Sequence, residues 1–510
     1  MKIRPLCIAA AVLILASTPS LTAKPNIVVF LVDDMGWQDT SVPFAKKVTP
    51  FNKRYRTPNM EKLAARGMKF TQAYACSVCS PSRVSLMTGL NAARHKVTNW
   101  TLKRNASNDS RHPRLGFPGW NVNGLSPVTG IEHTVHAEPL PIVLRKAGYR
   151  TIHAGKAHFG AIGTPGEDPL NVGFDVNIGG HAAGGPGSFL GQQNFSAAHR
   201  GGAKVWNVPG LEKYHGKDIF LTEAITIEAN HAINQAVAAK MPFFLYLAHY
   251  AVHVPFTPDA RFIEKYQQAG LPKTEAMYAA MVEGMDKSLG DVMANIERHG
   301  LGDNTVILFM SDNGGLSAHG RGGSAHTHNL PLSSGKGSAH EGGVRVPMIV
   351  DWPGITKEGS VSETPVIIED FFPTILEIAG IRDFVQIGGK MDGVSFGSSL
   401  TGGMGKSHSE RALIWHYPNQ WGPSGPGIGA SSTIRKGDWK LIYYHDPARK
   451  VRYELFDLSK DLGEQNNLAV EKPEMARELA KELGNYLREA EATMPVVKAT
   501  GKMVAYPGTE

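Results

Sequence analysis

The sequence predicts an α/β protein with a mostly parallel central sheet flanked by helices, followed by a smaller C-terminal α+β subdomain made of an antiparallel sheet and a helix. Three continuous apolar runs are typical of strands buried on both faces: 25–32, 242–248 and 305–310. Apolar residues at helical spacing between these runs predict helices at 57–67, 138–147 and 275–299. Shorter strands are predicted at 68–74 and 148–154.

The pattern changes near 388–405, where Gly and Ser are frequent and the α/β alternation stops. A helix is predicted at 473–490, and short alternating strands precede it at 412–415, 432–435, 440–444 and 453–457. We therefore expect three parts: a signal peptide at 1–23, a main domain at 24–400 and a C-terminal subdomain at 401–510.

The first 23 residues have the features of a secretory signal peptide. Lys2 and Arg4 precede an apolar run that is too short to span a membrane, and small residues lead to a cleavage site after Ala23. We expect a periplasmic or secreted protein with no membrane anchor. Cys7 would be removed with the peptide, which leaves two cysteines and no disulfide framework.

The mature chain carries only a weak positive charge, because loss of the signal peptide lowers the net charge from +7 to +5. Such an excess suits an anionic substrate, although an ordinary solvated surface explains it equally well. With 42% hydrophobic and 19% charged residues, the composition is that of a globular protein. We expect no nucleic-acid partner.

The segment 79–89 combines a thiol, a predicted helix start and a guanidinium. Pro81 suits the first turn of a helix and Ser80 can cap it. We therefore expect Cys79 just outside a helix N-terminus, where backbone N–H groups attract anions. Arg83 would face the same anion.

Two other interpretations of Cys79 remain open. A cysteine before such a helix can be a small buried residue. Cys76 and Cys79 can also form a redox pair or half of a metal site. No partner Cys pair exists elsewhere, which argues against structural zinc.

Polar side chains follow two predicted strands at their carboxyl ends. Asp33 and Asp34 come directly after the first apolar run, and Asp312 and Asn313 follow the last one. Adjacent carboxylates repel unless a cation lies between them, and open α/β sheets bind ligands at this edge. Oxygen ligands without thiolate or imidazole favour Ca²⁺ or Mg²⁺ over zinc. An Asp pair that only caps the next turn is the alternative.

Three basic residues follow other predicted strands. Lys156 and His158 would point to the same side of an extended segment. Residues of these types are surface residues about as often as catalytic ones. His253 lies beyond the strand at 242–248, where a lone histidine is more often structural.

Two segments with little periodicity are predicted to be loops near the site. The segment 179–202 is rich in Gly and His. The segment 100–127 carries planar cations and aromatic rings: Trp100, Arg104, Arg111, His112, Arg114 and Trp120. That mixture suits contacts with carbohydrate and sulfate, although an irregular surface loop is the default interpretation.

Together these segments resemble the type I, formylglycine-dependent sulfatases, in particular secreted bacterial polysaccharide sulfatases and arylsulfatases. The run 79–89 is similar to the family signature Cys-x-Pro-Ser-Arg followed by Thr-Gly. The run 155–160 matches a second family pattern except that Ala157 replaces the usual Trp. A His-x-Pro at His253 and the run 335–347 also match, in the family's order.

The resemblance covers nearly the whole mature chain and implies the alkaline-phosphatase-like fold, with 24–400 as the catalytic domain. Cys79 would be converted to Cα-formylglycine by a maturation enzyme, and the hydrated aldehyde would be the nucleophile. One calcium ion would be held by five residues: Asp33, Asp34, Asp312, Asn313 and the modified Cys79.

The resemblance also implies roles for the basic residues. Arg83 and Lys156 would stabilise the ionised hydroxyl of the hydrate, and His158 would take the proton of the second hydroxyl. Lys336 and His253 would hold the sulfate, and one of them would protonate the departing alcohol. Glu341 and Arg345, by contrast, are expected to be structural.

The function so implied is that of a sulfuric ester hydrolase, a sulfatase that removes sulfate from a polysaccharide-derived carbohydrate. A phosphonate or phosphate ester hydrolase of the same superfamily is the first alternative, since formylglycine can serve both reactions. A catalytically silent glycan-binding protein is the second. Loss of Cys79, Lys156 or His158 would indicate a silent protein, and all three are present.

Overall fold

The computed structural model describes residues 24–317, 321–403, 408 and 410–509. The predicted signal peptide lies outside these residues. Within the described part of the chain, no helix is long and apolar enough to cross a membrane.

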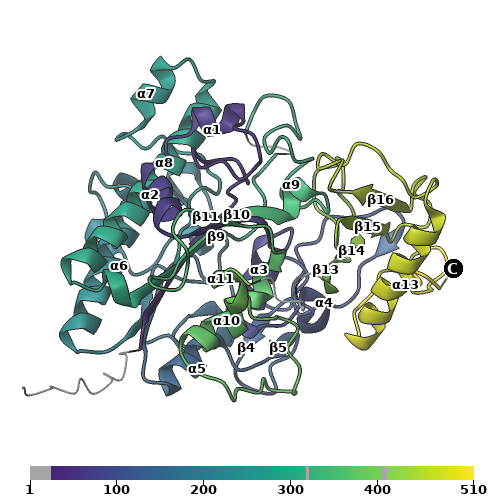
Figure 1. Cartoon of the computed structure of the whole chain (residues 1–510), viewed down its shortest axis with the longest axis horizontal. Helices are drawn as coiled ribbons and strands as arrows, with labels where there is room; N and C mark the ends of the chain where they lie inside the picture. The colour runs from purple at the N-terminus through teal and green to yellow at the C-terminus, as the bar shows by residue number, and fades with distance from the viewer. Residues whose placement is uncertain (1–23, 318–320, 404–407, 409, 510) are drawn as a thin grey trace, which may run out of the picture.

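A nine-stranded sheet forms the centre of the molecule (Figure 1). Its strands lie in the order β11 (Ser360–Ser362), β2 (Met68–Tyr74), β10 (Arg345–Asp351), β9 (Thr305–Ser311), β1 (Asn26–Val32), β8 (Phe243–Ala248), β6 (Arg150–Gly155) and β7 (Val176–Ile178), and β12 (Val366–Ile367) also pairs with β2. Every pairing is parallel except the two made by β10. This confirms the predicted mostly parallel sheet.

Helices cover both faces of this sheet. Alternate residues of β1 enter different cores, so that Ile27 faces one core and Val28 the other. The first core is closed by α3 (Cys79–Thr88), α5 (Leu140–Lys146) and α10 (Phe371–Ile378), and the second by α2 (Pro58–Arg66), α6 (Leu221–Ala238) and α8 (Lys273–Arg298) (Figure 1). Burial on both faces explains why the strand sequences are apolar throughout.

The helix α6 is the one long element of the main domain that we did not predict from the sequence. Many of its buried positions are alanines, such as Ala224, Ala229 and Ala232, rather than large apolar residues. Its apolar stripe is therefore weak, and the helical period is hard to recognise.

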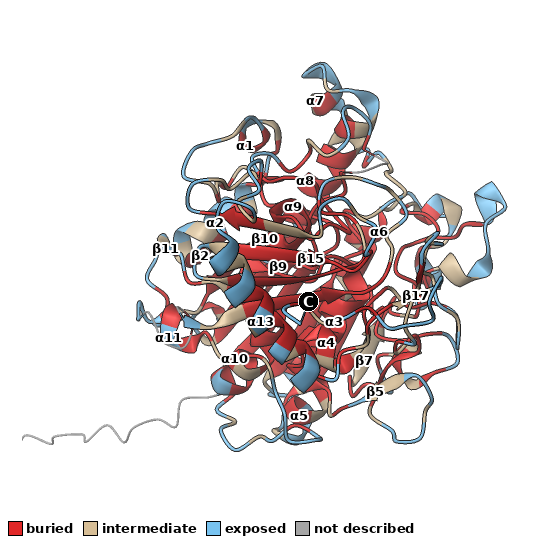
Figure 2. Cartoon of the chain, turned by 90° about the vertical axis from the view of Figure 1, so that its right-hand side faces the viewer, coloured by how far each residue is buried: buried red, intermediate tan, exposed pale blue. Residues whose placement is uncertain are grey.

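The C-terminal part forms the predicted antiparallel sheet and helix. The sheet consists of β13 (Ala412–Tyr417), β14 (Ser431–Lys436), β15 (Trp439–Tyr444) and β16 (Tyr453–Asp457), in that order. The helix α13 (Pro473–Glu489) buries Leu479, Leu483 and Leu487 and turns its other side to solvent (Figure 2).

Buried polar contacts join this second sheet to the central one. Lys440 Nζ, in β15, lies 2.9 Å from Glu341 Oε1 and 2.9 Å from Glu464 Oε1. Glu341, the first residue of α9 (Glu341–Val344), also pairs with Arg345 at 3.1 Å and accepts a hydrogen bond from the Tyr74 hydroxyl at 2.7 Å. We name these five residues the inter-sheet cluster. Glu341 and Arg345 thus have structural partners.

Candidate active site

The ends of four parallel strands bring the predicted polar residues together. β1 and β9 are paired up to their last residues, so Asp33 and Asp312 follow at neighbouring positions. β8 lies on the other side of β1 with β6 beyond it, and Lys156 comes directly after β6. All four strands end at one edge of the sheet, where open α/β sheets bind ligands.

Three buried carboxylates meet at this edge, and we name Asp33, Asp34 and Asp312 the carboxylate cluster. Each contributes an oxygen, and these oxygens lie within 4.8 Å of one another. Asp33 Oδ1 and Asn313 Oδ1 are buried and have no hydrogen-bond partner among the described residues. Buried oxygens without a donor are costly. The all-oxygen donor set therefore fits a hard divalent cation such as Ca²⁺.

Each carboxylate of the cluster also has one buried cationic partner. The three ion pairs are Lys156–Asp33 at 2.7 Å, Lys336–Asp34 at 2.6 Å and Arg83–Asp312 at 2.8 Å. Three positive charges thus balance three negative ones before any metal ion binds.

Burial and these partners shift the pKa values of Asp33 and Asp34 in opposite directions. Burial raises the pKa of Asp33 above its ordinary value, although Lys156 opposes the shift. Burial also raises the pKa of Asp34, but Lys336, His253 and Lys156 together lower it by more. The pKa of Asp34 therefore lies below its ordinary value. A further positive charge would therefore favour the ionised form of Asp33 in particular.

The nucleophile candidate Cys79 is the first residue of α3, and the extended Val78 precedes it without a side-chain cap. The predicted cap at Ser80 is wrong. The Ser80 hydroxyl instead accepts the backbone N–H of Thr101 at 3.2 Å and ties α3 to a neighbouring loop. Pro81 lies in the first turn, where its missing N–H costs no helical hydrogen bond.

Both remaining cysteines are buried and free, so the structure shows no disulfide between Cys76 and Cys79. Burial raises the pKa of each thiol above its ordinary value. Neither side chain is therefore a reactive thiolate in its unmodified form.

Arg83 is completely buried and connects α3 with two strand ends. Its Nε donates to Asp312 Oδ2 at 2.9 Å, and its Nη1 donates to the Lys156 carbonyl at 2.7 Å. The guanidinium thus holds the carboxylate cluster and the end of β6 in fixed positions beside residue 79.

His158 has one ring nitrogen engaged and one available. Its Nε2 lies 2.9 Å from the Thr101 carbonyl, which can only accept, so Nε2 carries the proton and Nδ1 is left as a base. Nδ1 is buried and has no partner among the described residues. Burial first, and then Lys156, lower the pKa of His158, which keeps the ring neutral.

The backbone around His158 differs from the prediction. The segment is not extended there, because His158 has φ 56°, in the left-handed region that His tolerates better than most residues. Gly184 makes room for the ring, since a Cβ at that position would lie 2.2 Å from His158 Cε1. The ring position therefore depends on a glycine in the loop at 179–202.

His253 and Lys336 lie on the other side of the cluster. His253 Nδ1 donates to the Val254 carbonyl at 2.8 Å, and its Nε2 lies 3.7 Å from Asp34 Oδ2. Burial and Lys336 lower the pKa of His253 to about 3. Lys336 is thus the charged member of the pair, and Asp34 helps to raise its pKa.

These groups surround a cavity of about 230 Å³. Cys79, His158, His253, Lys336 and Asp34 line it together with three tryptophans from separate segments, Trp100, Trp206 and Trp421. All three tryptophans are only partly buried. A charged floor and aromatic walls therefore face one small space.

Most of the polar and aromatic residues singled out at 100–127 do not contribute to this space. Arg114 forms a close ion pair with Asp446, His112 lies 3.8 Å from the same carboxylate, and Trp120 is buried in the core. Arg104 and Arg111 are exposed and do not line the cavity. Of the residues named in that segment, only Trp100 lines it.

The sequence matches the family model described as Sulfatase over residues 25–381, about 70% of the chain, and the model described as N-sulphoglucosamine sulphohydrolase, C-terminal, over residues 335–493. The chain belongs to the sulfatase family. Members of this family hydrolyse sulfate esters, and the central sheet with its flanking helices is the alkaline-phosphatase-like fold.

Curated relatives and solved structures agree with this assignment. This sulfatase is 31% identical to a sulfatase of Formosa agariphila, with 91% of this chain and 88% of that protein covered. It is 33% identical to mouse N-acetylgalactosamine-6-sulfatase, with 74% and 66% covered. The crystal structure of Ps i-CgsB superposes with a TM-score of 0.70 at 25% identity, covering 91% and 93%, and that protein has also been solved with k-i-k-neocarrahexaose.

Two tryptophans at the site of this sulfatase, Trp206 and Trp421, were missed from the sequence, and Gly184 and Gly185 were not singled out within the predicted loop at 179–202. They come from long loops without a hydrophobic period, so no local pattern points to them. The clustering of glycine near 180–187 was the one available signal, because glycine allows close approach to other groups. Trp421 lies in the C-terminal part, far in sequence from every predicted site residue.

Proposed function

We propose that this sulfatase removes sulfate from a sulfated carbohydrate, using residue 79 as the nucleophile after conversion of Cys79 to Cα-formylglycine by a maturation enzyme. The observation that carries the proposal is the position of Cys79 at the start of α3, in a cavity that also exposes a histidine base and a lysine. As an unmodified thiol, Cys79 has a raised pKa because burial outweighs the opposing effect of Lys156 and Lys336, so it is a weak nucleophile.

Calcium fits the donor set described above. Asp33, Asp34, Asp312, Asn313 and the modified residue 79 would hold the ion, and the bound ion would supply positive charge for a sulfate oxygen. Lys156, Lys336 and Arg83 stay beside the three carboxylates and keep them in place.

The modified side chain would, as a hydrate, attack sulfur with one hydroxyl and so expel the alcohol. Deprotonation of the second hydroxyl would then break the bond between the side-chain carbon and the sulfate oxygen, release sulfate and restore the aldehyde. Arg83 and Lys156 then stabilise negative charge at residue 79. His158 takes the proton of the second hydroxyl, and its free Nδ1 suits that role because Nε2 is fixed on the Thr101 carbonyl.

Lys336 and His253 would hold the sulfate, and one of them would protonate the departing alcohol. A neutral His253, with its Nδ1–H on the Val254 carbonyl, presents a bare Nε2 that can only accept. Lys336 already carries a proton, so the geometry favours Lys336 as the acid.

The aromatic walls support a sugar as the alcohol. Partly buried tryptophans offer flat apolar faces for the C–H faces of a sugar ring, with an indole N–H for its hydroxyls. Trp421 Nε1 is buried and has no partner among the described residues. Mouse N-acetylgalactosamine-6-sulfatase and the neocarrahexaose complex of Ps i-CgsB support the same substrate class.

The charge balance favours a sulfate ester over a phosphate monoester. The three buried cations are each paired with one aspartate, so the excess positive charge at the site would be only that of a single calcium ion. A sulfate ester carries one negative charge and needs less compensation than a doubly charged phosphate. This charge balance disfavours a phosphate monoester, whereas a phosphonate monoester, which also carries one negative charge, is an alternative that the experiment must test.

The test is a panel of sulfated mono- and oligosaccharides scored for released sulfate, with phosphate and phosphonate esters included. The enzyme is produced with the maturation enzyme and compared with Cys79→Ser. We expect sulfate release from at least one sugar and almost none from the variant. Preferential phosphate or phosphonate hydrolysis, or no turnover by mature enzyme across the panel, would contradict the proposal.

A further inference from the structure

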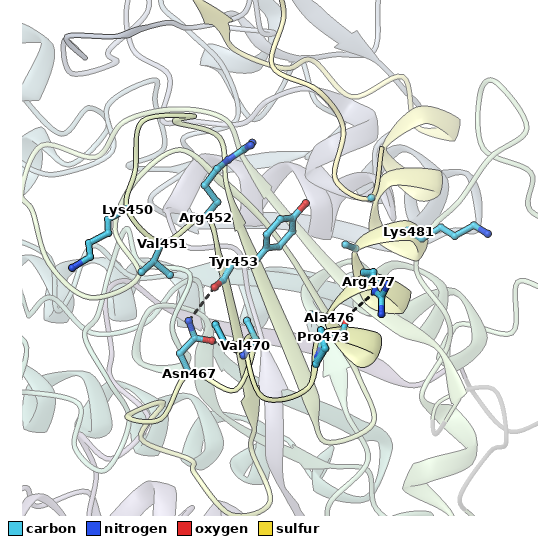
Figure 3. Close-up of a pocket in the computed structure, with 13 residues that line it drawn as sticks. Lys450, Val451, Arg452, Tyr453, Asn467, Val470, Pro473, Ala476, Arg477 and Lys481 are labelled. Atoms are coloured by element: carbon cyan, nitrogen blue, oxygen red, sulfur yellow. Dashed lines mark hydrogen bonds between the residues drawn. The ribbon is translucent and has the colours of Figure 1, made fainter. Parts of the chain in front are cut away.

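A second hollow lies in the C-terminal part of the molecule and shares no lining residue with the active-site cavity. It is enclosed by the turn before β16, by the segment that leads to α13 and by α13 itself (Figure 3). Its volume is about 680 Å³, compared with about 230 Å³ for the active-site cavity. Ligand sites in proteins are typically about 300–1,000 Å³.

Specific contacts shape the walls of this hollow. Asn467 Nδ2 donates to the Tyr453 carbonyl at 3.0 Å (Figure 3). Asn467 Oδ1 accepts the backbone N–H groups of Leu455 and Ala469, each at 2.9 Å. On the opposite wall, a Cβ at Gly508 would lie 2.7 Å from Lys481 Cα, so the chain packs directly on α13 there. The hollow is thus preformed.

Part of its lining is apolar and exposed. Val451, Val470 and Pro473 line the hollow, and the two valines are 40% and 89% exposed. The Tyr453 ring lies between the turn and the helix (Figure 3). Exposed apolar surface of this kind commonly marks a binding site, and it suits the C–H faces of sugar rings.

The rim of the hollow is basic. Lys450, Arg477 and Lys481 line it, no acidic side chain of the described chain does so, and none of these three forms an ion pair with a described residue. Glu482, one position beyond Lys481, is paired with Lys436 instead. Arg477 Nε donates to the Pro473 carbonyl at 3.2 Å, which holds that side chain along the helix.

The charges are spread over the width of the hollow. Lys450 extends from one side and Lys481 from the other, and Arg477 lies near the latter (Figure 3). Cations so placed do not converge on one small anion. They suit an extended ligand that carries several negative groups separated by apolar faces.

We propose that this hollow is a non-catalytic binding site for a sulfated polysaccharide chain. The proposal rests on the proposed function in one respect, because the bound polymer would be one whose sulfate esters the active site hydrolyses. Holding one part of a chain here raises the local concentration of its other parts near the cavity. Nucleic acid is less suited to the hollow, because single strands bind through stacked aromatic rings. Among the described residues that line the hollow, only Tyr453 has such a ring.

The binding test uses a variant that cannot consume its ligand. In a Cys79→Ala background, the triple variant Lys450→Ala, Arg477→Ala, Lys481→Ala is compared with a control triple, Lys62→Ala, Lys357→Ala, Arg382→Ala. The control removes the same charge from exposed residues of the main domain that form no ion pair with described residues. The probe is a sulfated carrageenan hexasaccharide, measured by calorimetry beside its desulfated form, inorganic sulfate and single-stranded DNA of matched charge.

We call the variant with Lys450→Ala, Arg477→Ala and Lys481→Ala the pocket triple. We expect it to bind the sulfated hexasaccharide at least about tenfold more weakly than the control triple, a loss of about 1.4 kcal/mol of binding free energy. The desulfated form should not bind to the hollow. Equal affinities in the two triples would overturn the proposal, as would tighter binding of DNA or a loss confined to inorganic sulfate. Equal melting temperatures of the two triples exclude misfolding as the cause.

Kinetics on mature enzyme separates this proposal from the active-site assignment. The pocket triple should raise KM for a sulfated polymer by a similar factor while kcat and KM for a sulfated monosaccharide stay within about twofold of the control. Equal loss on both substrates would contradict a separate site. Absence of turnover by every variant would instead count against the proposed function, and the binding comparison would still decide the question of the hollow.

Discussion

Two buried clusters of charge lie at different places in this sulfatase, and their hydrogen bonds differ. In the inter-sheet cluster every charge has a counter-ion, and Lys440 Nζ lies between two glutamates. Glu464 Oε1 makes no hydrogen bond with a described residue, but it lies 2.9 Å from that ammonium group. In the carboxylate cluster the charges are balanced too, yet Asp33 Oδ1, and Asn313 Oδ1 beside the cluster, have no hydrogen-bond partner and no cation paired with them among the described residues. A satisfied cluster fixes a structure, whereas a cluster with unused oxygens can bind something else. Mutations should separate these roles.

The largest effect is expected at the carboxylate cluster. Asp312→Asn removes a negative charge from the proposed calcium site and the partner of Arg83, so kcat/KM for sulfate release should fall at least about a thousandfold. Calcium content, measured by mass spectrometry of the folded protein, should fall with it. Asp303→Asn, at an exposed position, is the control. Full activity in Asp312→Asn would show that the cluster has no catalytic role.

The inter-sheet cluster should respond in stability instead. Lys440→Met leaves Glu341 and Glu464 buried without their shared cation, which typically costs about 3–5 kcal/mol of the free energy of unfolding. Activity per folded molecule should change little. Lys436→Met, which breaks an exposed pair with Glu482, should cost about 0–1 kcal/mol. Denaturant unfolding measures both, and similar costs for the two variants would erase the distinction.

A smaller effect is expected where the backbone positions the base. Gly184→Ala places a Cβ 2.2 Å from His158 Cε1, so the ring must move, and kcat should fall about a hundredfold with little change in KM. Gly119→Ala adds its Cβ where no heavy atom lies within 4 Å and is the matched control. Unchanged kcat in Gly184→Ala would argue against His158 as the base.

A pH-dependent effect on stability is expected at Glu369, a buried acid outside both clusters that forms no ion pair with a described residue. Burial, with a contribution from Asp370, raises its pKa from 4.5 to about 8. The folded protein therefore favours the protonated form of Glu369. The resulting contribution to the free energy of unfolding is fully present below pH 4.5 and is lost as the pH rises through about 8. Between pH 5 and 9 the free energy of unfolding should fall less in Glu369→Gln than in the wild type. Parallel pH profiles would contradict the raised pKa.

The fold and the carboxylates of the site could be predicted from spacing, whereas the roles of Cys79, His253 and Lys336 came from the family resemblance. Apolar runs in the sequence predict buried strands, and Asp33 and Asp312 follow the carboxyl ends of two of them. Loop residues follow no such rule. Trp421 reaches the cavity from the C-terminal part, whereas Arg114, which looked equally suited to a substrate, pairs with Asp446. Which loop side chains meet a cavity depends on tertiary packing that no local pattern records.

The proposed mechanism depends on an aldehyde at residue 79, which mass spectrometry detects. Peptide mass spectrometry of fully active enzyme should show an aldehyde in place of the thiol at position 79 and an unmodified thiol at Cys76, which lacks the Pro and Arg spacing of the signature. An intact Cys79 thiol, or a disulfide between Cys79 and Cys76, in fully active protein would contradict the proposed mechanism.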